Sequence, residues 1–291
     1  MHRLLALPVL ASLFAATCSA PADGSPDDAP GAARVSEAPA ATRPNVPYAL
    51  AAPSATVELP DEIREISGLT VFEDGTLGAV QDEIGTLYTL SAATGEIVGR
   101  EVFKERGDFE GVERVGDDVW VLRSDGDLYR IRRSAASVEA ERFQTDLAGR
   151  NDTEGLAYDE AGNRLLIACK ENPGSGLQDV RAIYAFSLAT NTLSPAPVFT
   201  LDRRLVDTSD AFKPSALAVR PRTGELYVLS SVRKAVAVLA RDGSLQTVIS
   251  LPEALFAQPE GLAFAPDGTL YISNEGPNGP ATLLRFDPTD R

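Results

Sequence analysis

The segment Thr153-Glu-Gly-Leu-Ala-Tyr-Asp is followed after a short turn by the alternating run Asn163-Arg-Leu-Leu-Ile-Ala, and this pair decides the fold. A further run, Ala182-Ile-Tyr-Ala-Phe, continues the pattern. Two-residue periodicity bounded by Gly, Asp and Asn is typical of β-strands linked by hairpins. No helical periodicity of similar length competes with it. We therefore expect an all-β domain.

The first of these segments is one of five similar segments. The five are Ile66-Ser-Gly-Leu-Thr-Val-Phe, Phe109-Glu-Gly-Val-Glu-Arg-Val, Thr153-Glu-Gly-Leu-Ala-Tyr-Asp, Pro214-Ser-Ala-Leu-Ala-Val-Arg and Pro259-Glu-Gly-Leu-Ala-Phe-Ala. Their small residues, four glycines and Ala216, are 43, 44, 61 and 45 residues apart. A repeat of about 40 to 50 residues is typical of one four-stranded propeller blade. The spacing predicts a β-propeller with five blades, or six if the long interval holds another.

Five blades are favoured because the excess in the long interval lies in two turn-like or polar stretches, 172–180 and 203–212. The last blade has only three strands before the chain reaches Arg291, whereas Ala55-Thr-Val-Glu-Leu-Pro is a strand without a blade. We expect this N-terminal strand to complete the last blade and close the ring, which removes an open sheet edge. The propeller domain is predicted to span residues 54–291.

The N-terminus has the features of an export signal. His2 and Arg3 precede an apolar run from Leu4 to Ala16, which is too short to span a bilayer. Ala15-Ala-Thr-Cys18 resembles a lipoprotein processing box, although Ala15 and Thr17 depart from the usual pattern. We predict a signal peptide over residues 1–18 with lipidation of Cys18, or else ordinary cleavage after Ala20.

The next segment, residues 19–53, reads as a disordered tether. Alanine and proline make up 18 of its 35 residues, with little that would nucleate a core. A lipid anchor followed by a tether predicts a cell-envelope location, on the outer membrane or the periplasmic face, with a secreted protein as the alternative. Membrane contact would then occur through the N-terminal lipid only, and a monomer is expected.

Composition excludes several kinds of chemistry. The only histidine is His2, and the cysteines are Cys18 and Cys169, so removal of the signal leaves no histidine. This excludes Ser-His-Asp and Cys-His nucleophiles and the usual Cys/His zinc sites. The net charge of −15 repels nucleic acid and anionic lipid surfaces. Cys169 falls in an alternating strand and is expected to be a small buried apolar residue.

In a propeller the first strand of each blade lines the central channel, so equivalent residues form a ring. The residues before the small ones are Ser67, Glu110, Glu154, Ser215 and Glu260. Three carboxylates should therefore meet at one mouth, close to the polar ends of the second strands. A shell of oxygens without histidine or thiolate suits calcium. The candidate metal ligands are Glu110, Asp152, Glu154, Glu171, Glu260 and Glu275.

A structural explanation competes with metal binding. The ring glutamates would then accept hydrogen bonds from backbone amides and pair with Arg123, Arg150 and Lys170. The aromatic residues at equivalent strand positions are expected to pack between blades. They are Tyr88, Trp120, Tyr129, Tyr184, Tyr227 and Tyr271.

The repeats resemble the SdiA-regulated (YjiK/CarP-type) bacterial β-propellers from Thr56 to Pro288. The segments that carry the resemblance are Ile66-Ser-Gly-Leu-Thr, Phe109-Glu-Gly-Val-Glu, Thr153-Glu-Gly-Leu-Ala-Tyr, Lys170-Glu-Asn-Pro, Leu226-Tyr-Val-Leu-Ser-Ser, Gln258-Pro-Glu-Gly-Leu-Ala and Tyr271-Ile-Ser-Asn-Glu. The resemblance implies an exported or membrane-attached propeller, with a link to calcium homeostasis in some members. Ala216 departs from the glycine of the other repeats, which puts a polar ligand from this blade in doubt.

The preferred function is binding of a divalent cation in the channel and of a protein or glycan partner on one face. The alternative is a metal-dependent hydrolase resembling the esterase-like phytases or calcium-dependent lactonases, with Glu154 and Glu171 as catalytic candidates. Lys170 and Arg123 would hold its anionic substrate, but the sequence indicates no basic cluster near the acids. A purely structural role is a third possibility, because fold does not determine function.

Overall fold

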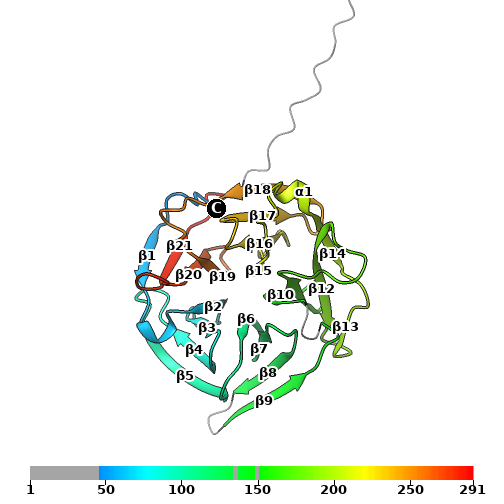
Figure 1. Ribbon diagram of the computed structural model, residues 1–291. Coiled ribbons are helices and arrows are strands. Elements are labelled where there is room, and N and C mark those ends of the chain that lie inside the picture. The colour runs from blue at the N-terminus through cyan, green and yellow to red at the C-terminus, as the bar shows by residue number, and fades with distance from the viewer. Residues whose placement is uncertain (1–45, 134–136, 148–150, 291) are drawn as a thin grey trace, which may run out of the picture. The chain divides into compact units, whose positions relative to one another are not determined.

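Each of the five repeats forms one antiparallel sheet, and the sheets stand around a common axis in the computed structural model (Figure 1). The structure describes residues 46–133, 137–147 and 151–290. In every sheet the strand that carries the repeated motif lies next to the axis, and the other strands lie progressively outward (Figure 1). The prediction of a five-bladed β-propeller is confirmed.

The first two blades each contain four strands. Blade one consists of β2 (Ile66–Val71), β3 (Leu77–Gln81), β4 (Gly85–Leu90) and β5 (Ile97–Lys104). Blade two consists of β6 (Phe109–Val115), β7 (Asp118–Arg123), β8 (Leu128–Arg133) and β9 (Val138–Phe143). Asp-Gly turns connect strands within both blades, and Gly75 and Gly126 adopt the positive φ angles, 83° and 87°, that such turns require.

The third blade has a divided outer edge. Its inner strands are β10 (Thr153–Asp159), β11 (Arg164–Cys169) and β12 (Val180–Ser187). Both β13 (Thr192–Leu193) and β14 (Phe199–Asp202) pair with β12. Blade four consists of β15 (Ala216–Val219), β16 (Leu226–Ser230), β17 (Ala235–Leu239) and β18 (Leu245–Ser250).

The N-terminal strand closes the ring as predicted. Blade five contains β19 (Pro259–Phe264), β20 (Leu270–Asn274), β21 (Thr282–Phe286) and β1 (Ala55–Glu58). Strand β1 pairs antiparallel with β21 from Ala55 opposite Arg285 to Glu58 opposite Thr282. A short 3₁₀ helix, η1 (Asp61–Ile63), then leads into blade one. Hydrogen bonding between the two ends of the domain satisfies the edge of the last blade.

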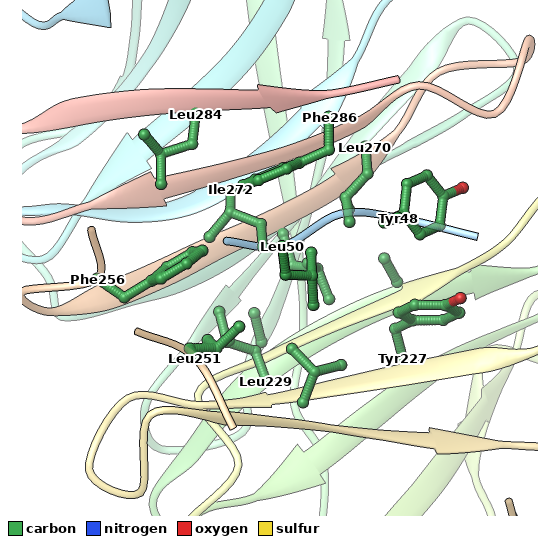
Figure 2. Close-up of a cluster of buried hydrophobic side chains, with 14 of the residues drawn as sticks. Tyr48, Leu50, Tyr227, Leu229, Leu251, Phe256, Leu270, Ile272, Leu284 and Phe286 are labelled. Atoms are coloured by element: carbon green, nitrogen blue, oxygen red, sulfur yellow. The ribbon is translucent and has the colours of Figure 1, made fainter. Parts of the chain in front are cut away.

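The domain begins earlier than the sequence indicated. Tyr48 and Leu50 are 7 % and 6 % exposed and pack with Leu229 and Ile272 in the core between blades four and five (Figure 2). The hydroxyl of Tyr48 donates to the carbonyl oxygen of Gly268 at 2.7 Å. The expected tether boundary at residue 53 is therefore wrong for residues 46–53, because Pro47, Tyr48 and Leu50 are buried in the domain. The predicted signal peptide, Cys18 and residues 19–45 lie outside the described residues.

Packing between blades uses the aromatic residues that recur in the repeats. The ring centroids of Tyr227 and Phe264 are 5.0 Å apart with an edge-to-face orientation. Trp120 of blade two packs on Phe186 of blade three at 5.7 Å and on Phe143 of its own blade at 5.1 Å. The prediction of inter-blade packing is confirmed for these residues, which contribute large buried apolar areas. In the part of the chain that the structure describes, no helix is long and apolar enough to cross a membrane.

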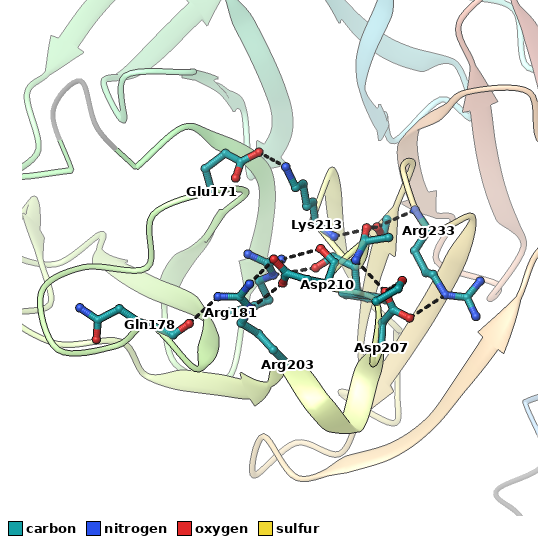
Figure 3. A network of polar contacts seen from close by, with 12 residues as sticks. Glu171, Gln178, Arg181, Arg203, Asp207, Asp210, Lys213 and Arg233 are labelled. Atoms are coloured by element: carbon teal, nitrogen blue, oxygen red, sulfur yellow. Dashed lines mark hydrogen bonds and ion pairs between the residues drawn. The ribbon is translucent and has the colours of Figure 1, made fainter.

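The long interval between repeats three and four contains no additional blade. It forms a loop before β12 and a segment with the one-turn helix α1 (Arg203–Val206). Arg181, which is buried, donates to the carbonyl oxygen of Phe212 at 2.6 Å and to Asp210 Oδ1 at 2.7 Å. Arg203 donates to the same Asp210 oxygen and to the carbonyl oxygen of Gln178, both at 2.5 Å (Figure 3). These contacts join the two insertions.

Candidate functional site

A β-bulge directs the ring residues out of the regular strand pairing. Phe109 pairs with Arg123 and Gly111 with Leu122, so Glu110 has no partner on β7. Glu154 and Glu260 occupy the equivalent bulge positions on β10 and β19. A bulge re-aims the side chain of its additional residue. Three of the five blades thus place a carboxylate at the same mouth of the channel.

The glycine after each bulge allows the inner strands to approach one another. A Cβ atom on Gly111 would lie 2.6 Å from Leu156 Cβ, and one on Gly155 would lie 2.7 Å from Leu217 Cγ. Both distances are shorter than carbon atoms tolerate, so a larger residue would push the blades apart. The repeated Glu-Gly pair therefore combines a directed carboxylate with close packing of neighbouring blades.

The innermost ring contains a cation of its own. The ammonium of Lys170, directly after β11, donates to Glu154 Oε1. The side chains of Lys170 and Glu154 are 28 % and 7 % exposed. Burial lowers the pKa of Lys170, but the carboxylates of Glu154, Glu260 and Asp152 outweigh it and raise the pKa above its ordinary value. The structural explanation is thus confirmed for this one pair.

The pKa values of all three ring carboxylates are raised. Burial, followed by repulsion from Glu154, raises the pKa of Glu110 to about 10. Burial and the neighbouring Glu260 raise the pKa of Glu154 to about 8, although Lys170 opposes this shift. Burial also raises the pKa of Glu260, against hydrogen bonds from Ser231 and Ser215 that lower it. Protons or cations would relieve the repulsion among these groups.

A second set of acids surrounds this ring. Burial and repulsion from Glu65 and Asp108 raise the pKa of Asp82 to about 6. Asp82 Oδ1 is buried and has no hydrogen-bond partner among the described residues. Burial and the carboxylate of Glu260 raise the pKa of Glu275 to about 8. Burial likewise raises the pKa of Asp152. Asp82, Glu110, Asp152, Glu154, Glu260 and Glu275 together form what we call the acidic mouth.

Two residues that were expected at the site, Glu171 and Arg123, form ion pairs outside the ring. Glu171 forms an ion pair with Lys213, and its side chain is 46 % exposed (Figure 3). Arg123 contacts Asp125 and Asp127, the latter at 2.8 Å, rather than a ring glutamate. The expected pairing of Arg123 with the ring is therefore wrong, because nearer carboxylates in its own hairpin bind it. Arg150 lies outside the described residues.

The acidic mouth is not a preformed metal cage. Within residues 46–133, 137–147 and 151–290, no group of three or more acidic, histidine or cysteine side chains is gathered closely enough to hold a metal ion. Lys170 lies among the carboxylates that a metal would require. Cation binding would therefore need side chains to rearrange around the ion.

A basic pocket adjoins the acidic mouth, which the sequence did not indicate. Its volume is about 280 Å³, and its lining includes Lys170, Lys213, Lys234 and Glu260. The expectation that no basic cluster lies near the acids is wrong because these lysines, far apart in sequence, come from blades three and four. Only one signal pointed to them, namely that each lies within three residues of a strand end. We call this cavity the lysine pocket.

The opposite end of the channel contains a carboxylate that the sequence analysis also missed. Glu113 on β6 accepts hydrogen bonds from Thr70 Oγ1 of blade one at 2.8 Å, from Arg114 N at 2.9 Å and from Tyr158 N of blade three at 3.2 Å. It lines a pocket of about 250 Å³ together with apolar residues such as Phe264. Glu113 therefore connects three blades.

Comparison with known families agrees with this architecture. A family model described as SdiA-regulated matches residues 50–280, which include every residue of the acidic mouth. The chain belongs to the SdiA-regulated family. The expected resemblance is thus confirmed, and the acidic mouth and lysine pocket described above are features of an SdiA-regulated propeller.

Solved structures share the fold of this SdiA-regulated protein at low identity. The glutaminyl cyclase of Myxococcus xanthus is 16 % identical, with a TM-score of 0.55 over 82 % of this chain and 97 % of that one. The PQQ-bound aldose sugar dehydrogenase of Streptomyces coelicolor is 11 % identical, with a TM-score of 0.54 over 81 % and 97 %. A putative gluconolactonase is 17 % identical, with a TM-score of 0.52 over 79 % and 77 %. At such identities the similarity shows the fold alone.

Proposed function

We propose that the acidic mouth binds a divalent cation, that calcium is the favoured ion, and that the protein offers this face to a protein or glycan partner at the cell envelope. The observation that carries the proposal is the gathering of six carboxylates around one channel mouth, where Asp82 Oδ1 is buried without a hydrogen-bond partner among the described residues. A buried carboxylate oxygen without a donor is costly, and a cation would satisfy it.

The donor set supports calcium over softer metals. Carboxylate, amide and hydroxyl oxygens are hard ligands, and calcium accepts irregular shells of six to eight of them. Because Lys170 competes for Glu154 and the carboxylates have to rearrange, we expect weak binding, with Kd on the order of 10⁻⁴ to 10⁻³ M, as in extracellular modules. Binding would release protons, because the pKa values of Glu110, Glu154 and Glu275 are raised.

A thermal melt of the purified protein tests this proposal. The protein is stripped with EDTA and then titrated separately with calcium and magnesium. Calcium should raise Tm in the wild type but not in Glu154→Gln or Glu260→Gln. Glu139→Gln, on the exposed outer strand β9, serves as the control and should respond like the wild type. The absence of any calcium shift in the wild type would contradict the proposal and favour internally paired glutamates.

The proposed partner binding and the proposed location at the cell envelope rest on two different observations. Leu205 in the second insertion and Val232 in the turn between β16 and β17 are 67 % and 57 % exposed, and Val232 lines the lysine pocket. This arrangement supports partner binding on the face of the acidic mouth. Attachment through Cys18 is tested by palmitate labelling in cells, which should be lost in Cys18→Ser. Unchanged labelling in that variant would exclude Cys18 as the anchor.

A metal-dependent hydrolase is the second candidate, and the lysine pocket favours it. Lys170, Lys213 and Lys234 lie beside Glu260, so an anionic substrate and a metal-activated water have adjacent places. The test is turnover of p-nitrophenyl phosphate and of a simple lactone with added calcium. Activity that is lost in Glu154→Gln and Glu171→Gln but kept in Glu139→Gln would support hydrolysis. No turnover by the calcium-loaded wild type would reject this candidate for those two substrates.

A further inference from the structure

The lysines of this chain are concentrated at one place. Of its 27 basic residues only four are lysines, Lys104, Lys170, Lys213 and Lys234, and the others are arginines. Three of the four lysines line the lysine pocket. They follow β11, precede β15 and precede β17, so their meeting depends on the propeller and not on their spacing in sequence. In a chain of net charge −15, the pocket lining thus brings three ammonium groups together with one carboxylate, Glu260.

The lysines differ in the partners that they already have. Lys170 is paired with Glu154, and Lys213 with Glu171, whose side chain is half-exposed (Figure 3). Lys234 forms no ion pair with any described residue, and its backbone has a φ of 48° at the turn before β17. An ammonium without a partner in a pocket is available to an anionic ligand. The exposed pair between Lys213 and Glu171 is weak enough to be exchanged for such a ligand.

The remaining polar lining supplies both donors and an acceptor. Ser215, Ser231 and Gln258 carry hydroxyl and amide groups, and Glu260 carries a carboxylate. Ser215 is buried, Glu260 and Gln258 are half-buried, and the amide of Gln258 donates to Glu275. An acceptor beside three ammonium groups suits a ligand that has its own hydroxyl groups in addition to an anionic group. The volume of about 280 Å³ suits a molecule of the size of a monosaccharide acid.

We propose that the lysine pocket binds the carboxylate or phosphate group of a small hydroxylated ligand, with Lys213 and Lys234 contacting the anionic group and Glu260 accepting a hydrogen bond from a hydroxyl. Lysine suits this task because its ammonium is a compact charge on a flexible stem, whereas an arginine such as Arg100 forms a fixed, forked pair with Glu62. The inference goes beyond the proposed cation site and does not require a metal.

Isothermal titration of the full protein in EDTA tests this inference. The probes are glucose 6-phosphate, gluconate, inorganic phosphate and neutral glucose. Binding of glucose 6-phosphate or gluconate, but not of glucose, is expected, and the stronger of the two identifies the anionic group. Affinity should fall about tenfold in Lys234→Met, in line with the loss of one charge-assisted hydrogen bond. Lys104→Met, at the only lysine outside the pocket, should bind as the wild type does.

A second variant keeps the test informative if the lysine variants misfold. Val232 lines the pocket and is 57 % exposed, so Val232→Glu adds an opposing charge at little cost in folding. It should weaken binding at least as much as Lys234→Met. The inference is overturned if no probe binds at millimolar concentration, if glucose binds as well as its anionic derivatives, or if binding is equal in Val232→Glu and the wild type. A separate titration with calcium as the ligand tests the cation proposal. Failure of anion binding then leaves cation binding testable, and the reverse also holds.

Discussion

The ammonium of Lys170 donates a hydrogen bond to the carboxylate of Glu154 on the adjacent strand, so the narrowest ring of carboxylates is partly neutralised from within. The pair leaves Glu110 and Glu260 without an ammonium that is directly bonded to them. Burial and repulsion from Glu154 raise the pKa of Glu110, whereas the bonded ammonium of Lys170 opposes the rise in the pKa of Glu154. An internal cation that neutralises only part of a ring is compatible with both stability and the binding of another cation.

Replacing Lys170 tests how much of the ring it neutralises. Lys170→Met leaves Glu154, which is 7 % exposed, without its partner, so the free energy of unfolding should fall by about 2 kcal/mol at pH 8. At pH 5 the loss should be smaller, because Glu154 is then protonated. Urea denaturation at both pH values measures the difference, with Lys104→Met as the control. An equal loss at pH 5 and pH 8 would show that the stem of Lys170 contributes by packing rather than by charge.

The acidic mouth predicts lower stability at alkaline pH. The folded pKa values of Glu110, Glu154 and Glu275, about 10, 8 and 8, are above the ordinary value of 4.5. Groups with a raised folded pKa stabilise the protein fully below their unfolded pKa and lose that contribution as pH rises through the folded value. Stability should therefore fall from pH 5.5 to pH 9 in EDTA. A loss of about 2 kcal/mol would lower Tm by about 4–8 °C.

A loss of stability on lowering the pH is expected only under acid conditions. Hydrogen bonds from Ser209 lower the pKa of Asp207 to about 2, so its contribution is lost only as pH falls below its ordinary value of 3.8. Thermal melts between pH 5.5 and pH 9 therefore report on the acidic mouth. Calcium should restore part of the stability at pH 9. A Tm that rises with pH across this interval in EDTA would contradict the raised pKa values.

Glu113 is expected to be a structural residue of the opposite mouth. Glu113→Ala removes the acceptor for Thr70 Oγ1 and Tyr158 N and leaves a buried amide unpaired, which should cost about 2–3 kcal/mol. Calcium and anion binding should be unaffected. Glu139→Ala, on the exposed outer strand, should cost less than about 0.5 kcal/mol. Urea denaturation of the two variants provides the comparison, and equal midpoints would exclude a connecting role for Glu113.

Arg181 is expected to hold the two insertions in place. Arg181→Met removes donors to the Phe212 carbonyl oxygen and to Asp210, and we expect the segment 203–212 to be cleaved by protease at least several-fold faster. Arg204→Met provides a matched control, because the Arg204 side chain is 77 % exposed and lies 4.0 Å from Asp179. Cleavage rates that are the same for both variants would show that the insertions are held by other contacts.

Cys169 should be unreactive in the folded protein. Its side chain is buried, and burial raises the pKa of its thiol to about 12, so almost no thiolate is present at neutral pH. In Cys18→Ser protein, Ellman's reagent should detect no thiol before unfolding and one thiol in denaturant. Rapid labelling of the native protein would contradict the observed packing of β11.

Much of the fold could be predicted because each repeat contains the sequence signals for its own strands and turns. Alternating residues such as those of β11 pair with strands only a turn away, and the five copies of the inner-strand motif set the number of blades. The same logic identified Glu110, Glu154 and Glu260, because equivalent positions of a propeller meet at its axis. Tyr48 and Leu50 were assigned to the tether, since no repeat precedes them and their burial depends on blades four and five.

The sequence by itself determined the five-bladed ring, its closure by β1 and the convergence of carboxylates on one mouth, because local periodicity and repetition encode these features. Only the tertiary structure decided which charges meet there. Glu154 forms an ion pair with Lys170 and not with Arg123, and Glu171 forms one with Lys213. Three lysines line one pocket. The physical reason is that ion pairing depends on distances of a few ångströms between side chains from different blades, which no spacing along the chain specifies.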